Sequence, residues 1–371
     1  MKRIVALLLV LCLFMCGCSP APEEPATEPS TEITEPSTEP STEPSTEPST
    51  EPTTEPTEPP VLYRHPLTGA PLDAPFTGRS TAVVINNIKD ALPQYGIGQA
   101  DIVYEIETEG GITRCLAIYS DFTGIGSIGP VRSARTYFSN VAVSYDAPLI
   151  HCGGSSAALK AHYDDGNDTI NNWNHINEQY NGSYFFRDYE RYNSGFLWEH
   201  TLFTNGEKML TALAKKGYNT VNENGTDYGL LFDEDVALSG ETANTITVKF
   251  LGKKTTTLTY DAASGEYKAS QYGDAWVDKG IDQQLSYENV MVLYTDQWKK
   301  RDEAYSRSYY DLIGSGEGLY ACDGKIIPIK WSRESLRKPF VYTMADGTPL
   351  VLNVGKTYIA ITADSVTSTY E

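Results

Sequence analysis

Short apolar runs and alternating apolar and polar residues dominate the first part of the chain after residue 60. Residues 81–85 consist of Thr81 and four consecutive apolar residues, residues 101–108 alternate, and residues 112–119 follow across a turn that contains Gly110 and Gly111. Alternation places successive side chains on opposite faces of a sheet. The pattern therefore predicts one buried strand followed by a β-hairpin.

After Gly129 and Pro130 the apolar spacing becomes helical. Apolar residues recur every three or four positions between residues 134 and 145, and Ser133 is placed to cap this helix. A short strand at 147–152, a second helix at 156–163 and a third at 205–216 complete this part. We expect residues 61–238 to form an α/β domain, a mixed sheet with helices.

The last third of the chain has a different pattern of apolar and polar residues. Its apolar runs are short and are separated by turn sequences such as Ala345-Asp346-Gly347. The runs are at 245–250, 256–260, 290–294, 325–330, 349–354 and 358–362. They predict a mostly antiparallel β domain over residues 239–371.

The first residues have the layout of a secreted lipoprotein. Lys2 and Arg3 precede an apolar run at 4–15, which Cys16-Gly17-Cys18 follows. We expect a signal peptide at 1–17 and a lipid on Cys18, because Gly17 is small enough to precede the cleaved bond. An uncleaved signal anchor is the alternative, but the run is shorter than the ~20 apolar residues that cross a bilayer.

Residues 18–60 predict a disordered stalk. From residue 19 onwards they repeat Ser-Thr-Glu-Pro, with no aromatic residue and Ile33 as the single branched aliphatic one. Such a segment cannot bury enough apolar surface to fold. Frequent proline favours an extended chain at ~3.1 Å per residue, long enough to hold a globular head away from the membrane.

Charge and cysteine content narrow the function classes. The chain has 49 acidic and 29 basic residues, of which residues 1–60 contribute 11 and two, so the head has 38 acids and 27 bases. An acidic head argues against nucleic acid as a partner. Cysteine and histidine spacing indicates no metal site, and no motif indicates a cofactor. The odd number of head cysteines leaves the pairing of Cys115, Cys152 and Cys322 open.

Two arginines follow the predicted turn at Gly129. Arg132 and Arg135 lie at the start of the helix, where the helix dipole already contributes positive charge. Cations at this end are unfavourable unless a negative group is present. This arrangement predicts a site for phosphate or carboxylate.

The alternating strand before it is acidic. Glu105, Glu107 and Glu109 are expected on one face. They form either a buried ion-pair network with Arg114, Arg132 or Arg135, an exposed acidic face, or a working site. In the working site Glu105 and Glu109 act as general acid and base.

A third set of polar residues follows the strand at 147–152. His151 and Ser155 flank a glycine-rich turn at the carboxyl end of that strand, which is where α/β folds bind ligands. His151 is a candidate catalytic residue, Ser155 a ligand-binding one, and Cys152 is expected in the core. Arg187 and His200 lie among aromatic residues, which tilts the expected ligand toward a glycan.

These segments resemble the YerB-like lipoproteins of Gram-positive bacteria, a family of unknown function with N-terminal and C-terminal parts. The resemblance rests on residues 100–105, 109–114 and 129–135, on His151 with Gly153-Gly154-Ser155, on Arg187-Asp188 and His200, and on residues 311–316 and 353–357. It implies a membrane-tethered envelope protein and no specific reaction. Glu107 and Cys152 are outside the family pattern.

The sequence thus favours a lipoprotein on the outer face of the cytoplasmic membrane that binds an anionic envelope component such as peptidoglycan. Glu105, Glu109 and His151 are the candidate catalytic residues of an alternative, a glycan-processing enzyme. A second alternative is a scaffold that recruits envelope proteins. The candidate ligand-binding residues are Arg114, Arg132, Arg135, Ser155, Arg187 and His200.

Overall fold

The computed structural model describes residues 63–159, 169–171, 182–222, 227–234, 236–252, 254–302 and 305–371. The predicted signal peptide, the lipidation site at Cys18 and the predicted stalk lie outside these residues. From Pro60 to Glu371 the chain forms one compact unit. Within the described residues, no helix has both the length and the apolar character needed to cross a bilayer.

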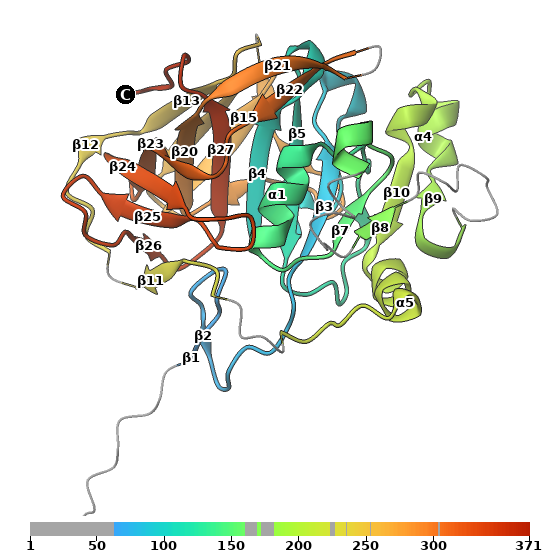
Figure 1. The fold of residues 1–371 in the computed structure, drawn as a ribbon, viewed down its shortest axis with the longest axis horizontal. Helices are drawn as coiled ribbons and strands as arrows, with labels where there is room; N and C mark the ends of the chain where they lie inside the picture. Colours follow the sequence, from blue (N-terminus) through green and yellow to red (C-terminus); the bar gives the residue numbers. More distant parts are fainter. Residues whose placement is uncertain are drawn as a thin grey trace, which may run out of the picture. The chain divides into compact units, whose positions relative to one another are not determined.

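The centre of this unit is a mixed sheet whose strands come from both halves of the sequence (Figure 1). The order across the sheet is β12, β24, β23, β20, β27, β4, β5, β3, β7 and β8, and β25 pairs with β24. In chain order the strands are β3 (Thr81–Asn86), β4 (Ile102–Glu107), β5 (Thr113–Tyr119), β7 (Leu149–His151), β8 (Thr169–Asn171), β12 (Glu241–Thr242), β20 (Asn289–Thr295), β23 (Gly314–Cys322), β24 (Lys325–Arg333), β25 (Val341–Met344) and β27 (Thr357–Ala363).

A second sheet comes entirely from the C-terminal part. Its order is β16, β15, β14, β13 and β28, and β19 pairs with β15. The strands are β13 (Thr245–Lys249), β14 (Thr255–Asp261), β15 (Glu266–Gln271), β16 (Asp274–Ala275), β19 (Ser286–Tyr287) and β28 (Thr369–Tyr370). The predicted class, a mixed N-terminal part and a β-rich C-terminal part, is confirmed.

Strands from the two predicted domains are neighbours in the central sheet. β27 runs parallel to β4, with Ile359 opposite Tyr104, and β4 is antiparallel to β5. The predicted hairpin is therefore present, with Glu109–Gly111 as its 3₁₀ turn, η3. The predicted boundary near residue 239 separates two patterns of apolar and polar residues. The central sheet contains strands from both sides of this boundary.

The central sheet is covered on both faces. Val103 and Ala117 on one face share a core with Ile246 and Leu258 of the second sheet. Tyr104 and neighbouring side chains on the other face pack with the helix α1 (Thr136–Ser144). Strands that are buried on both faces explain why residues 81–85 lack alternation.

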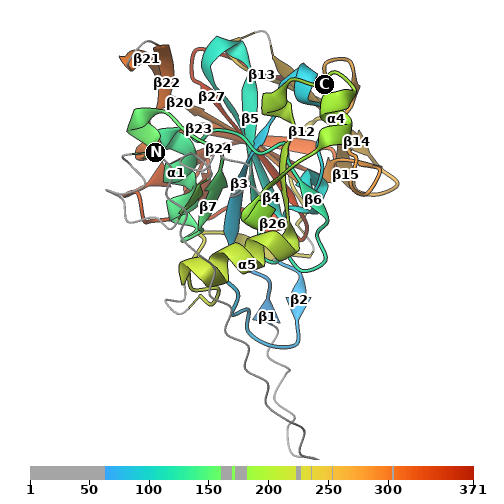
Figure 2. The same ribbon diagram turned by 90° about the vertical axis from the view of Figure 1, so that its right-hand side faces the viewer.

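Further helices and short strands surround this core (Figure 2). The helices are η1 (Lys89–Ala91), η2 (Ile97–Gln99), α4 (Tyr189–Asn193), η5 (Trp198–His200) and α5 (Gly206–Lys216). The short strands of the N-terminal part are β1 (Tyr63–Arg64), β2 (Pro71–Leu72), β6 (Ser127–Ile128), β9 (Phe186–Arg187), β10 (Leu202–Asn205) and β11 (Leu231–Asp233). Those of the C-terminal part are β17 (Val277–Asp278), β18 (Gln283–Gln284), β21 (Gln297–Asp302), β22 (Tyr305–Tyr310) and β26 (Val351–Asn353).

The predicted cap of α1 is wrong. Arg135, not Ser133, is the residue before the first helical turn, and its side chain makes no capping hydrogen bond. The Ser133 carbonyl oxygen instead accepts a hydrogen bond from Arg114 Nη1 at 2.6 Å. The helix at 205–216 is confirmed as α5, where the Asn205 side chain accepts a hydrogen bond from Lys208 N.

Candidate functional site

The segment at 130–134, which contains Arg132, lies between two parallel strands. Arg132 N donates to Val84 O in β3 at 2.9 Å, and Cys152 N, just after β7, donates to Arg132 O at 3.0 Å. The segment is therefore fixed by backbone hydrogen bonds where β3 and β7 end. The carboxyl ends of parallel strands are the usual ligand-binding edge of an α/β sheet.

Three arginines meet at this edge, and we name Arg114, Arg132 and Arg187 the arginine cluster. Burial lowers the pKa of Arg114 to about 9, and the positive charges of Arg135 and Arg132 add to the effect. Burial also lowers the pKa of Arg187, with a further contribution from Arg132. These mutual effects place like charges close together in a poorly solvated setting.

Few acids neutralise the arginine cluster. Glu199 lies 3.0 Å from Arg132, and about half of its side chain is exposed. Arg114 and Arg187 donate to backbone carbonyl oxygens, those of Ser133 and Trp198. Each also has a buried Nε atom with no hydrogen-bond partner among the described residues. The cluster thus keeps positive charge and donor capacity for an anion.

Asn86 and His200 lie beside the cluster. Asn86 Nδ2 and His200 Nδ1 are 3.1 Å apart, and both residues are 1% exposed. Their remaining polar atoms, Asn86 Oδ1 and His200 Nε2, are buried without a hydrogen-bond partner in the part of the chain that is described. Glu199 is 3.9 Å from His200 Nε2, beyond hydrogen-bond distance. Burial lowers the pKa of His200.

Arg135 is already neutralised. Its Nε and Nη2 atoms donate to both carboxylate oxygens of Glu109, with Nη2 at 2.6 Å from Oε2. Arg307 Nη1 approaches the same carboxylate at 3.6 Å. Burial raises the pKa of Glu109, but the Arg135 guanidinium outweighs it and the pKa is lowered overall. The pair has the geometry of a structural ion pair.

Glu105 is enclosed between the two sheets and is 0% exposed. Lys254 Nζ lies 3.1 Å from its carboxylate. Its hydrogen-bond donors come from four further side chains, namely Asn87, Thr113, Thr256 and Tyr358. Burial raises its pKa, but Lys254 and the hydroxyl donors outweigh this and lower it. This saturation favours the structural alternative over general acid-base work.

Two other predicted residues have local backbone contacts. His151 is 0% exposed, and its Nδ1 lies 2.7 Å from Gly153 O. Ser155 is buried, and its Oγ accepts a hydrogen bond from Ala158 N. Ser155 therefore caps the start of a helix. No disulfide joins Cys115, Cys152 and Cys322, which are all among the described residues.

Exposed aromatic residues border the arginine cluster. Tyr189, Tyr192 and Trp198 are 51%, 48% and 38% exposed, and we name them the aromatic patch. Both tyrosine rings meet the Trp198 ring edge to face, with centroids 6.1 and 5.4 Å away. The Arg187 guanidinium lies over the same ring at 4.4 Å. The arginine cluster and the aromatic patch are thus physically joined.

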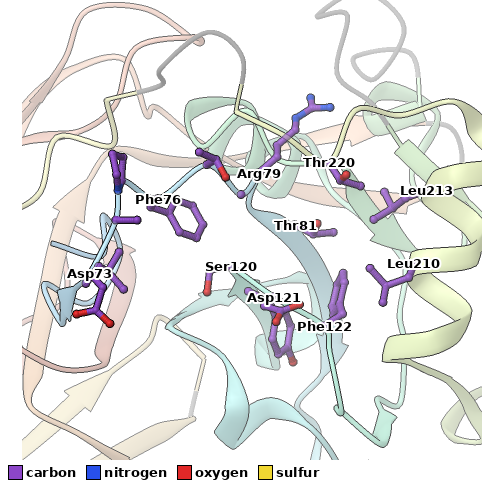
Figure 3. A pocket seen from close by; sticks show the side chains of 16 residues that line it. Asp73, Phe76, Arg79, Thr81, Ser120, Asp121, Phe122, Leu210, Leu213 and Thr220 are labelled. Atoms are coloured by element: carbon purple, nitrogen blue, oxygen red, sulfur yellow. The ribbon is translucent and has the colours of Figure 1, made fainter. Parts of the chain in front are cut away.

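A separate cavity of about 500 Å³ lies between the segment after β2 and helix α5. Figure 3 shows Phe76 and Phe122 with Leu210 and Leu213 around it. Arg79 at its rim is paired with Asp146 at 3.2 Å. None of the predicted site residues lines this cavity.

Sequence reasoning missed Asn86 and Glu199 as site residues. Asn86 was detectable in principle, because it is a polar residue at the end of an apolar run. Glu199 was visible as a polar residue next to His200 among aromatic residues, but its ion pair with Arg132 depends on the tertiary fold. No group of three or more metal-ligating side chains occurs among the described residues.

Comparison with known proteins finds matches over most of the chain. Residues 67–219 match the "Protein of unknown function (DUF3048) N-terminal domain", and residues 246–359 match the corresponding C-terminal domain. The protein named "Putative lipoprotein YerB" from Bacillus subtilis (strain 168) is 30% identical over 318 residues, 81% of this chain and 88% of that protein.

A solved structure also matches. A crystal structure of the YerB protein from Bacillus subtilis superposes with a TM-score of 0.71 at 28% identity. The match covers 83% of this chain and 99% of the other. Similarity in sequence and in fold therefore extends across both parts of the chain.

Proposed function

This chain belongs to the DUF3048 family, and from that premise we propose that it is a lipid-anchored envelope protein whose arginine cluster binds an anionic glycan such as peptidoglycan. The name of the Bacillus subtilis relative supports the lipoprotein assignment. The predicted lipidation of Cys18 gives the anchor, on the outer face of the cytoplasmic membrane.

The observation that carries the proposal is unneutralised positive charge at the carboxyl ends of β3 and β7. Among the described residues, Glu199 pairs with Arg132 and is half-exposed, and Glu109, which attracts Arg114, is already engaged by Arg135. Cations gathered in a partly desolvated site repel one another unless an anion joins them. A carboxylate or phosphate of the ligand would relieve this repulsion through charge-assisted hydrogen bonds.

The aromatic patch supports a glycan rather than a small anion. Sugar rings have apolar faces that pack on exposed aromatic rings, and Trp198 is fixed by Arg187 and by both tyrosines. A ligand that carries a carboxylate on a sugar can use the patch and the arginine cluster at the same time. Peptidoglycan has this combination.

The test is sedimentation with purified sacculi from which phosphate-containing polymers have been removed. The protein is a soluble chain that begins at Ser19 and keeps the whole compact unit. We expect the variant with Arg132→Gln and Arg187→Gln to bind at least tenfold more weakly, about 1.4 kcal/mol. Arg337→Gln, an exposed arginine between β24 and β25, is the matched control and should bind normally.

Two results would redirect the proposal. Equal sedimentation of the double variant and the parent would contradict binding at the arginine cluster. Soluble fragments released by the parent chain and detected by mass spectrometry would favour the glycan-processing alternative. Unchanged thermal unfolding of the double variant shows that a loss of binding is not a loss of fold.

A further inference from the structure

The strands β21 and β22 form a hairpin that belongs to neither large sheet. Among the described strands they pair with each other alone, from Gln297 opposite Tyr310 to Asp302 opposite Tyr305. Trp298 and Tyr309 are opposite one another, and their rings stack at 5.9 Å with an interplanar angle of 15°. Trp298 is 46% exposed. A large aromatic surface is therefore open to solution here.

The same hairpin concentrates positive charge in an acidic protein. Lys299, Lys300 and Arg301 are consecutive and exposed, and Lys299 interacts electrostatically with Glu107. Residues 297–310 contain four basic residues against two acidic ones, whereas the whole chain has 29 against 49. We name this element the basic hairpin.

Its pairing brings like charges together. Lys300 lies directly opposite Arg307 in the register, and like charges across a strand pair are destabilising. Arg307 Nη1 is 3.6 Å from Glu109, an acid that Arg135 already engages. An anionic ligand along the hairpin would add negative charge beside Lys300.

The position of the basic hairpin identifies the kind of partner. β1, where the described chain begins, and the basic hairpin lie at opposite ends of the unit in both views (Figures 1 and 2). The predicted anchor precedes β1 in the sequence. The hairpin thus lies far from the point at which the anchored segment enters, which favours a partner other than the membrane that holds the anchor.

We propose that the basic hairpin is a second binding surface, for a linear phosphate-bearing polyanion of the cell envelope. Successive side chains of β21 alternate between its two faces, so a flexible chain that wraps the strand would place phosphate groups beside Lys300 on the face that carries Trp298 and beside Lys299 and Arg301 on the other face. Trp298 would pack on the units between the phosphates. This contact is mainly electrostatic, so it should weaken steeply with salt. It does not depend on the arginine cluster.

The probe is linear inorganic polyphosphate, titrated into the chain that begins at Ser19 while tryptophan fluorescence is recorded. We expect the variant with Lys299→Gln, Lys300→Gln and Arg301→Gln to lose at least tenfold in affinity. The slope of log affinity against log salt should fall by about 2, at ~0.7 per lost contact. Trp298→Leu should weaken binding and reduce the fluorescence change. Lys330→Gln, an exposed lysine on β24, should change neither quantity.

Three outcomes would overturn this proposal. They are no binding of polyphosphate, binding that the triple variant retains, and binding to phosphatidylglycerol vesicles but not to polyphosphate, which would indicate a membrane surface. Failure here is distinguishable from failure of the proposed function, because the arginine cluster is tested on sacculi without phosphate polymers. Circular dichroism of the triple variant reports whether the fold is kept.

Discussion

Glu109 is an acid for which the sequence allowed an exposed position, and in the fold it forms an ion pair with Arg135. It lies in the turn η3, and its carboxylate accepts three hydrogen bonds from Arg135. Its side chain is 19% exposed, so the pair is only partly screened by solvent. The sequence predicted this contact as one of several alternatives, because the helix start and the hairpin turn both carry charge.

Replacing Glu109 should produce a pH-dependent loss of stability. The folded-state pKa of Glu109 is lowered from 4.5, so its contribution is present above pH 4.5 and is lost as pH falls through the lowered value. We expect Glu109→Gln to lower the free energy of unfolding by about 2 kcal/mol at pH 7. Below pH 4.5 the difference from the parent should shrink.

Urea unfolding at a series of pH values measures this. Glu317→Gln, an exposed acid on β23, is the control and should stay within about 0.5 kcal/mol of the parent. A Glu109→Gln deficit that is the same at pH 7 and at pH 3 would contradict the ion-pair account.

The partner of Glu105 could not be predicted from the sequence around it. Alternation correctly placed it on one face of a strand, and a buried ion-pair network was among the alternatives. Its cationic partner is Lys254, not an arginine. Lys254 is far away in the sequence, and only the packing of the second sheet on the central one brings the two together.

At the scale of elements, the two helix starts behave differently. Asn205 caps α5 by accepting from Lys208 N at 2.8 Å, whereas no side chain caps α1. We expect Asn205→Ala to cost about 1 kcal/mol of stability, because a backbone donor of the first turn loses its partner.

Ser133→Ala is the matched control for that variant. The Ser133 hydroxyl caps nothing, so its removal should change the free energy of unfolding by less than about 0.5 kcal/mol. Both values come from urea unfolding at pH 7. A larger loss for Ser133→Ala than for Asn205→Ala would show that the caps are misassigned.

The strands could be predicted more fully than their partners. The apolar runs correspond to β3, β4, β5 and β7, and the later runs correspond to β13, β14, β20, β24, β26 and β27. Local periodicity determines where a strand occurs. It does not reveal that β27 lies beside β4, because that pairing joins segments from the two ends of the head.

At the scale of the whole molecule, the N-terminal and C-terminal parts share a sheet and a buried polar network. Thr256 and Tyr358 from the C-terminal part donate to Glu105 at 2.7 Å, and Lys254 pairs with it. Neither part can keep these contacts alone. We therefore expect the unit from Pro60 to Glu371 to unfold as one.

Glu105→Gln tests this expectation. Loss of one charge from a buried pair leaves Lys254 uncompensated, which should cost about 3–5 kcal/mol. Far-ultraviolet circular dichroism and tryptophan fluorescence should both follow a single transition at a lower urea concentration. Two separated transitions would indicate that the two parts fold independently.

The sequence predicted a positively charged candidate site, but it did not predict which of the arginines form ion pairs within the protein. Arg114, Arg132 and Arg187 were predicted as ligand-binding residues from local sequence, and in the structure the charge of Arg132 acts on each of the other two. Arg135 has a partner in Glu109, and Ser155 caps a helix. Which cations retain unneutralised charge depends on long-range contacts, which no local pattern contains.

The central claim is that the arginine cluster binds an anionic glycan. Its most direct test is the fraction of protein that sediments with phosphate-free sacculi as salt is raised, for the parent chain and for the Arg132→Gln, Arg187→Gln variant. The account predicts that the parent sediments at low salt and is released as salt increases, while the variant stays in solution throughout. Identical sedimentation of the two proteins at every salt concentration would contradict it.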